Sequence, residues 1–180
     1  MNAAFLIKKK SYEKIEYFLR RHPITYIPRL LLFIVSVFLP IALYFMINTI
    51  FPNLLSNEKI YAITVIVTSI YYLSILLFSY TNFVEFYLDA WIVTNDRVVD
   101  IEQFGLFSRT ISELELFRIQ DITVDVHGIF ATLFKYGTLT IMTASSNLNI
   151  VFKNIPSPNK VRQKLLQLAN EDFKYHRNET

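Results

Sequence analysis

Residues 60–84 read IYAITVIVTSIYYLSILLFSYTNFV, a run of 25 residues without one charged side chain. The hydrocarbon core of a bilayer is about 30 Å thick, and a helix needs about 20 apolar residues to cross it. A lone segment in lipid satisfies all of its backbone N–H and C=O groups only as a helix. A buried core helix of this length is the weaker alternative in a chain of 180 residues. The run therefore predicts a transmembrane helix that holds the residues after it at the membrane surface.

A second uncharged run, residues 30–51, precedes the first and contains Pro40. The link of residues 52–59 is short and rich in turn formers, so we expect an antiparallel transmembrane hairpin over residues 24–84. Residues 1–29 carry seven basic and two acidic residues, whereas the link carries one of each. By the positive-inside rule, both chain ends then face the cytoplasm.

Small and polar residues recur every fourth position on both runs. They are Ser36, Pro40, Tyr44 and Asn48 on the first and Thr64, Thr68 and Tyr72 on the second. Such stripes typically mediate helix–helix contact in membranes, here with each other or with a partner. A translocation path is the alternative, but neither run carries a charged residue or histidine, which transport and proton relay usually require.

Residues 1–23 form a predicted basic juxtamembrane arm. Tyr12, Ile15, Phe18 and Leu19 share one side of a possible helix that ends before Pro23. This arm is either an in-plane helix on anionic headgroups or a solvated leader, and it lacks the long apolar core of a signal peptide. The residues expected to touch the membrane surface are Lys8, Lys9, Lys10, Lys14, Arg20, Arg21 and Arg29.

From residue 89 the hydrophobic period changes from helical to alternating, which predicts strands. We expect strands at 89–94 and 97–104 around Asn95-Asp96, at 122–126, and at 138–142 and 148–153 around a turn at Ser145-Ser146-Asn147. Ser157 and Pro158 then begin a helix whose apolar face is Val161, Leu165, Leu168 and Ala169. Residues 85–170 are thus one small β domain closed by a helix, and residues 171–180 are a frayed polar tail.

The order of several short segments resembles a known family. Two apolar helices precede WIVTNDR at 91–97, GLFSR at 105–109, RIQDITV at 118–124 and GIFATLFKYGTLTI at 128–141. This set resembles the bacterial membrane proteins with a pleckstrin-homology (PH)-like domain, the bPH2 or DUF304 type found in YdbS-like proteins. The resemblance implies an α+β membrane protein in the bacterial inner membrane, with an antiparallel PH-like sheet or barrel capped by a C-terminal helix. It implies no catalytic activity.

The resemblance also assigns fold positions. Trp91, Thr94 and Arg97 mark the first hairpin, Gly105 its neighbour, Ile119 and Gln120 a strand start, and Gly137 the turn into the next strand. The acidic Asp100 and Glu102 depart from the family pattern. A basic cluster like the phosphoinositide pocket of eukaryotic relatives is not found in the sequence.

The segment between His127-Gly128 and Lys135 contains four large apolar residues, Ile129, Phe130, Leu133 and Phe134. We expect them to plug one end of the barrel. The alternative is that they contact lipid or a partner chain.

The residues needed for common active sites are missing or far apart. The chain has no cysteine, only three glycines, and three histidines at positions 22, 127 and 176. It therefore lacks a thiolate, a glycine-rich phosphate loop and any metal-ligand spacing, and we expect no metal or cofactor. The carboxylate pairs Asp100/Glu102 and Glu113/Glu115 are expected on a solvated face rather than sharing a proton.

These features favour a non-catalytic scaffold that presents a β domain at the cytoplasmic face of the membrane. Its expected partners are membrane lipids and a protein or a second copy of the chain, with no nucleic acid. The alternative is an accessory subunit of a membrane export or resistance system.

Overall fold

The computed structural model describes residues 10, 12–52, 55–143 and 149–179, with side chains as far as residue 173. The chain forms two compact units. Residues Tyr26–Val84 form a helical hairpin, and Met1–Thr25 together with Glu85–Thr180 form a second unit, the β domain. The β domain is therefore discontinuous in sequence, which the division into arm, hairpin and C-terminal domain did not anticipate.

The hairpin consists of two long helices. A short 3-10 turn, η2 (Pro23–Tyr26), leads into α1 (Ile27–Ile50), and α2 spans Glu58–Leu88. Both helices are long and apolar enough, by length and composition, to cross a membrane. They extend beyond the predicted runs because charge alone does not end a helix, and α2 continues through Glu85 until Asp89.

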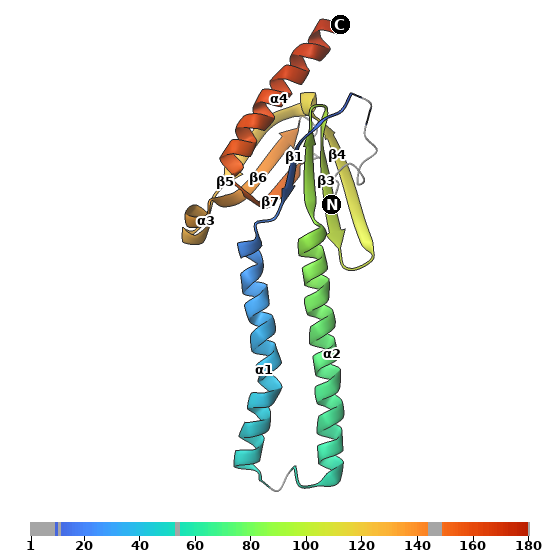
Figure 1. Ribbon diagram of the computed structural model, residues 1–180, viewed down its shortest axis with the longest axis vertical. Helices are drawn as coiled ribbons and strands as arrows, with labels where there is room; N and C mark the ends of the chain where they lie inside the picture. The colour runs from blue at the N-terminus through green and yellow to red at the C-terminus, as the bar shows by residue number, and fades with distance from the viewer. Residues whose placement is uncertain (1–9, 11, 53–54, 144–148, 180) are drawn as a thin grey trace. The chain divides into compact units, whose positions relative to one another are not determined.

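The first sheet contains β1 (Ile15–Arg20), β2 (Ala90–Thr94), β3 (Arg97–Phe104) and β4 (Ser108–Glu115), antiparallel and in that order. Leu19 pairs with Trp91 and Phe18 with Ile92. Because β1 precedes the hairpin and β2 follows it, the hairpin is inserted between two neighbouring strands of one sheet (Figure 1).

Both alternatives for the arm, an in-plane helix and a solvated leader, are therefore wrong for residues 15–20, which form a strand of the first sheet. Six residues are too few to separate a helical period from an alternating one. What decides the conformation is the edge of β2, which supplies backbone partners 70 to 79 residues farther along the chain.

The second sheet contains β5 (Ile119–Asp125), β6 (Tyr136–Thr143) and β7 (Ile150–Pro156). The 3-10 turn η3 (Leu116–Arg118) connects the sheets, and α3 (Ile129–Phe134) lies between β5 and β6. The sheets also meet beyond β1, where the His22 N–H donates to the Asn154 carbonyl at 2.8 Å. The predicted turn at residues 145–147 lies outside the described residues.

The core fills the space between the two sheets and α4 (Pro158–Glu179). Trp91 of β2 and Phe152 of β7 are fully buried, with ring centroids 5.5 Å apart. Val161, Leu165 and Leu168 of α4 complete this cluster, as their helical spacing predicted. In Figure 1, α4 runs beside β5 and β6.

Two local predictions differ from the structure. Helix α4 continues through the predicted tail to Glu179, and Asp172 accepts the N–H of Phe117 at 3.1 Å. Gly137 lies inside β6 rather than in a turn. A Cβ there would lie 2.7 Å from the Asp125 carbonyl oxygen, so the close approach of two backbones explains the glycine.

The β domain has two ends, which the strand registers define. The exit end holds the end of β1, the start of β2, the β3–β4 turn and α3. The far end holds the β2–β3 turn, the β4–β5 connection and the last part of α4. The chain leaves for the hairpin, and returns from it, at the exit end.

Candidate interaction sites of the β domain

Two of the arginines expected at the membrane surface are engaged within the β domain. Arg21 forms an ion pair with the buried Asp89, so the residues on either side of the hairpin are joined directly. The Arg20 guanidinium lies between the rings of Phe18 and Tyr87, 5.0 and 4.7 Å from their centroids. Both side chains thus have a structural role that the charge pattern did not reveal.

Carboxylates tie the last turn of α2 to β3 and the turn after it. Asp89 accepts the Gln103 N–H at 2.8 Å, and Glu85 accepts the Gly105 N–H at 2.7 Å. Gly105 has a φ of +61°, in the left-handed region, which suits glycine. Hydrogen bonds to charged groups are the stronger kind, so the returning chain is firmly held at the exit end.

Asp100 lies on the inner face of β3, directly opposite Trp91. It is buried, so the expectation of a solvated carboxylate is wrong at this position. Burial, reinforced by the nearby Glu102 carboxylate, raises the pKa of Asp100 to about 7. Its Oδ1 atom has no hydrogen-bond partner in the described part of the chain. Glu102 is half-buried and pairs with Lys153 of β7 at 3.0 Å.

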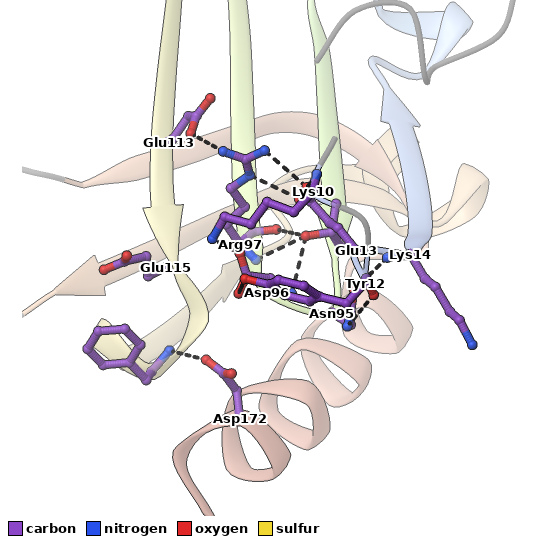
Figure 2. Close-up of polar contacts among 12 residues, drawn as sticks. Lys10, Tyr12, Glu13, Lys14, Asn95, Asp96, Arg97, Glu113, Glu115 and Asp172 are labelled. Atoms are coloured by element: carbon purple, nitrogen blue, oxygen red, sulfur yellow. Dashed lines mark hydrogen bonds and ion pairs between the residues drawn. The ribbon is translucent and has the colours of Figure 1, made fainter. Parts of the chain in front are cut away.

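At the far end, Glu13 and Arg97 form a buried ion pair (Figure 2). Arg97 Nε and Nη2 donate to the two Glu13 oxygens at 2.9 and 3.0 Å, a bidentate arrangement. Arg97 Nη1 also donates to Glu113 at 2.5 Å, and the Lys10 N–H donates to Glu13 at 2.9 Å. Burial raises the pKa of Glu13, but the hydrogen bonds from Arg97 and Lys10 outweigh it, and the net pKa is lowered.

The same cluster fastens the chain before β1 to the β2–β3 turn. The Lys14 N–H donates to Asn95 Oδ1 at 2.6 Å, and the Asn95 N–H donates to the Lys14 carbonyl at 3.1 Å. Lys10 Nζ pairs with Asp96 at 2.6 Å, and this hydrogen bond raises the pKa of Lys10. The Lys14 side chain is exposed and points away from the cluster in Figure 2.

The remaining predicted surface cations have different positions. Arg29 is exposed near the start of α1. Lys8 and Lys9 lie outside the described residues. Of the seven cations, Lys10, Lys14 and Arg29 are exposed, and the structure describes ion pairs for Lys10 and Arg21.

A groove of about 770 Å³ opens beside the far-end cluster. Phe117 and Phe173 contribute apolar surface, while Arg118 pairs with Glu115 at 2.8 Å on its rim. Ile119 and Gln120, assigned by the resemblance to a strand start, begin β5 and line this groove. The groove also takes in Lys10 and Thr143, which are more than 130 residues apart. No local sequence pattern could have identified it, because it is built from distant segments.

The four apolar residues at 129–134 do not plug the barrel. On α3, Ala131 is buried and faces the domain, whereas Ile129 is 84% exposed and Phe130 and Leu133 are each 68% exposed. Phe134 is also exposed. The core is already filled by both sheets and α4, so α3 turns its large side chains outward.

In the hairpin, two tyrosines of α2 contact the backbone of α1. Proline lacks an N–H, so Pro40 leaves the carbonyl of Ser36 without its helical donor. The Tyr71 hydroxyl donates to that carbonyl at 3.0 Å, and the Tyr72 hydroxyl donates to the neighbouring Val37 carbonyl at 3.1 Å. The helical spacing indicated Tyr72 but missed Tyr71, which lies one residue off the stripe.

The other stripe residues lie partly in this interface. Thr64 and Thr68 are half-buried and line an apolar groove of about 540 Å³ with Pro40 and Tyr44. Asn48 is exposed. The Thr64 hydroxyl donates to the Ile60 carbonyl of its own helix at 2.9 Å, so it offers its partner helix mainly a methyl group.

The first β hairpin of the domain depends on a threonine. Thr94 Oγ1 accepts the N–H groups of Asp96 and Arg97 and donates to the Arg97 carbonyl. Thr94 thereby closes the β2–β3 turn and orients Arg97 toward Glu13. Trp91 stands on the same strand, three residues earlier, in the core.

The described residues contain no group of three or more His, Asp or Glu side chains that could hold a metal ion. Glu113 and Glu115 on β4 are partly exposed and pair with Arg97 and Arg118. The arrangement offers ion pairs, apolar surface and strand edges, which are features of binding surfaces.

The chain is similar to known proteins in sequence and in structure. The family model bPH_2, bacterial PH domain, matches residues 29–169. The structure is similar to the crystal structure of a DUF1696 family protein with a pleckstrin-homology domain from Shewanella loihica PV-4. The sequence identity is 14%, the TM-score is 0.38, and the match covers 45% of this chain and 70% of that chain. The sequence has no significant match among curated proteins.

Proposed function

The chain belongs to the bacterial PH domain family (bPH_2), and from this premise we propose that it is a non-catalytic interaction module anchored in the bacterial cell membrane. The two helices of the hairpin cross the membrane, and the β domain presents binding surfaces at its cytoplasmic face. The module binds a protein, a second copy of itself or lipid headgroups.

The observation that carries this proposal is the insertion of the hairpin between β1 and β2. Both ends of the hairpin continue directly into paired strands, and Arg21 is joined to Asp89 across the insertion. Arg21 and Asp89 both belong to the β domain, so the two segments that flank the hairpin are joined to each other, and the hairpin is connected to one sheet by the chain at both of its ends.

Further support comes from the composition of the two helices. Most of their large apolar side chains are exposed, and none of their residues is buried. Such a surface is stable in lipid but costly in water, where it would exceed any ordinary apolar patch. The excess of basic residues before α1 sets the orientation, with both chain ends cytoplasmic.

A protein partner has a suitable surface in the far-end groove. The groove combines exposed aromatic surface with charged residues at its rim, the composition typical of interaction sites. It also adjoins β4, which ends the first sheet and has a strand partner on one side in the described structure. An extended segment can add to such an edge.

The absence of cysteine makes the test direct, because single cysteines can be placed without background labelling. We expect Asn57→Cys, in the link between α1 and α2, to react with an impermeant maleimide from outside intact cells. Asn170→Cys, on α4, should react only after the membrane is opened. The protein should also stay with membranes washed at alkaline pH.

Recovery in the aqueous fraction, or labelling of Asn170→Cys from outside, would contradict the anchored orientation. Photo-cross-linking from Tyr44 or Thr68 then separates the two partner classes. Products with the same chain support self-association, whereas products with a larger membrane protein support an accessory subunit of an export system.

A further inference from the structure

We propose that the exit end of the β domain is seated in the headgroup region of the bilayer through two apolar tips, α3 and the β3–β4 turn. This inference rests on the proposed insertion of the hairpin. It adds a second membrane contact, made by the β domain itself, and names the lipid surface as its partner.

The first tip is α3. Its inward side chain, Ala131, is buried, and its outward face carries Ile129, Phe130 and Leu133, each more than two-thirds exposed. The helix leaves its large apolar side chains outside a core that is otherwise densely filled. In water this arrangement costs free energy, and an apolar environment at this face removes the cost.

The second tip is the turn between β3 and β4. Phe107 is 98% exposed, the most exposed of the large apolar side chains in the described residues, and Phe104 is more than half exposed. Glycine at position 105 gives the turn its shape, and the bond from Gly105 N–H to Glu85 holds it in place. A fixed turn that presents a phenylalanine outward is suited to entering an apolar layer.

Both tips lie at the exit end. The position of the β3–β4 turn follows from the pairing of Ala90 with Ile101. The start of β2 lies beside the last part of β3, so the turn after β3 is at the exit end. The position of α3 follows from Tyr136, which begins β6 directly after it and stacks on His22 with ring centroids 5.5 Å apart. His22 is the residue before Pro23, where the chain turns into η2.

Exposed cations adjoin the apolar tips. Lys135 follows α3, and Arg109 follows Phe107 at the start of β4. Lys160 lines a small pocket with Lys135 and Ala131. Apolar side chains bordered by lysine and arginine suit the boundary between acyl chains and anionic headgroups.

The choice of lipid, rather than a protein or a second copy, follows from chain continuity. At the exit end the chain leaves the β domain after Thr25 and re-enters it at Glu85. Between these residues it forms the two helices that are long and apolar enough to cross a bilayer. Residues 23–26 separate His22 from α1, and Asp89 directly follows α2. The exit end is therefore the end of the β domain that the chain itself brings to the membrane.

Depth measurement on single-cysteine variants of the full chain tests the inference. Phe107→Cys, Ile129→Cys and Leu133→Cys carry a spin label in liposomes containing anionic phosphatidylglycerol. We expect each label to be more accessible to oxygen than to an aqueous nickel chelate. Phe173→Cys, an exposed phenylalanine at the far end, is the matched control and should show the reverse.

Leu73→Cys, an exposed position on α2, reports the hairpin separately. If the label at position 73 is in lipid while those at 107 and 129 are as accessible to the aqueous reagent as the label at 173, the exit end does not contact the headgroup region. The proposed membrane anchoring of the hairpin is then still supported. If Leu73 is itself aqueous, the proposed function fails with it. Labels at 107 and 129 that become immobile and inaccessible to both reagents as protein concentration rises would assign these tips to a protein interface and overturn the lipid assignment.

Discussion

The two ends of the β domain differ in how their charged and apolar side chains are arranged. At the far end, Glu13 and Arg97 are buried together, and Asp96, Asn95 and Thr94 hold the chain before β1 in place. At the exit end, the charged groups Asp89 and Arg21 turn inward while Phe107 and Ile129 face outward. The polar groups at the far end thus stabilise the β domain itself. The exit end uses its polar groups to join the chain segments that flank the hairpin, and its apolar side chains remain exposed.

The largest effect is expected from breaking the far-end ion pair. Arg97→Ala leaves the Glu13 carboxylate buried without its partner, which costs about 3–5 kcal/mol of the free energy of unfolding. Chemical denaturation in detergent measures the loss. The control is Lys10→Gln, which removes an exposed ion pair with Asp96 and should change the free energy of unfolding far less than Arg97→Ala does. Equal losses for the two variants would mean that the far end does not depend on burial of the pair.

The exit end should respond to pH through Asp100. Its pKa is raised to about 7 by burial, so between about pH 4 and pH 7 the folded state holds a proton that the unfolded state has released. The free energy of unfolding therefore falls as pH rises through this window and is constant above it. We expect Asp100→Asn to reduce this slope and to gain stability at pH 8 relative to wild type, because the variant no longer has a buried carboxylate to ionise.

Asp125→Asn is the matched control, because its carboxylate is exposed on the end of β5. It should leave the slope unchanged. The groups facing Asp100 are Glu102, Asp89 and Lys153. Burial also raises the pKa of Asp89, so a smaller slope should remain in Asp100→Asn. A slope as steep as in wild type would show that Asp100 is not the titrating group.

The smallest effect on folding is expected from the apolar tips. Phe107→Ser and Ile129→Ser remove exposed side chains that do not belong to the core, so each should change the free energy of unfolding in detergent by less than about 0.5 kcal/mol. A matched core variant, Ile122→Ser on β5, should lose several times more because its side chain is fully buried. Global unfolding of the Phe107 or Ile129 variants would show that the tips support the fold, and the contrast between the two ends would disappear.

The elements with a strong period were predictable from the sequence. Helices α1 and α2 follow from uncharged length, and β3 from alternation between Arg97 and Phe104, bounded by Asn95-Asp96 and Gly105. The inward face of α4 follows from the spacing of Val161, Leu165 and Leu168. In each case the pattern lies within a few turns or one strand, so neighbouring residues carry the whole signal.

The residues that were misjudged depend on partners far away in the chain. Residues 15–20 form β1 because β2, which follows the hairpin, has an edge that pairs with them. Arg20 packs against the ring of Tyr87 and Arg21 pairs with Asp89, so neither side chain is directed as the charge pattern predicted. Residues Lys10, Arg97, Phe117 and Phe173 meet in one groove only after both sheets and α4 have packed.

The sequence by itself determined that this protein has two long apolar helices and an alternating domain closed by a helix, because hydrophobic periodicity is a local property of the chain. Only the tertiary structure decided that Asp100 is buried, that α3 turns its apolar side chains outward and that the hairpin interrupts a sheet between β1 and β2. The reason is that burial and strand pairing depend on which distant surfaces are already occupied.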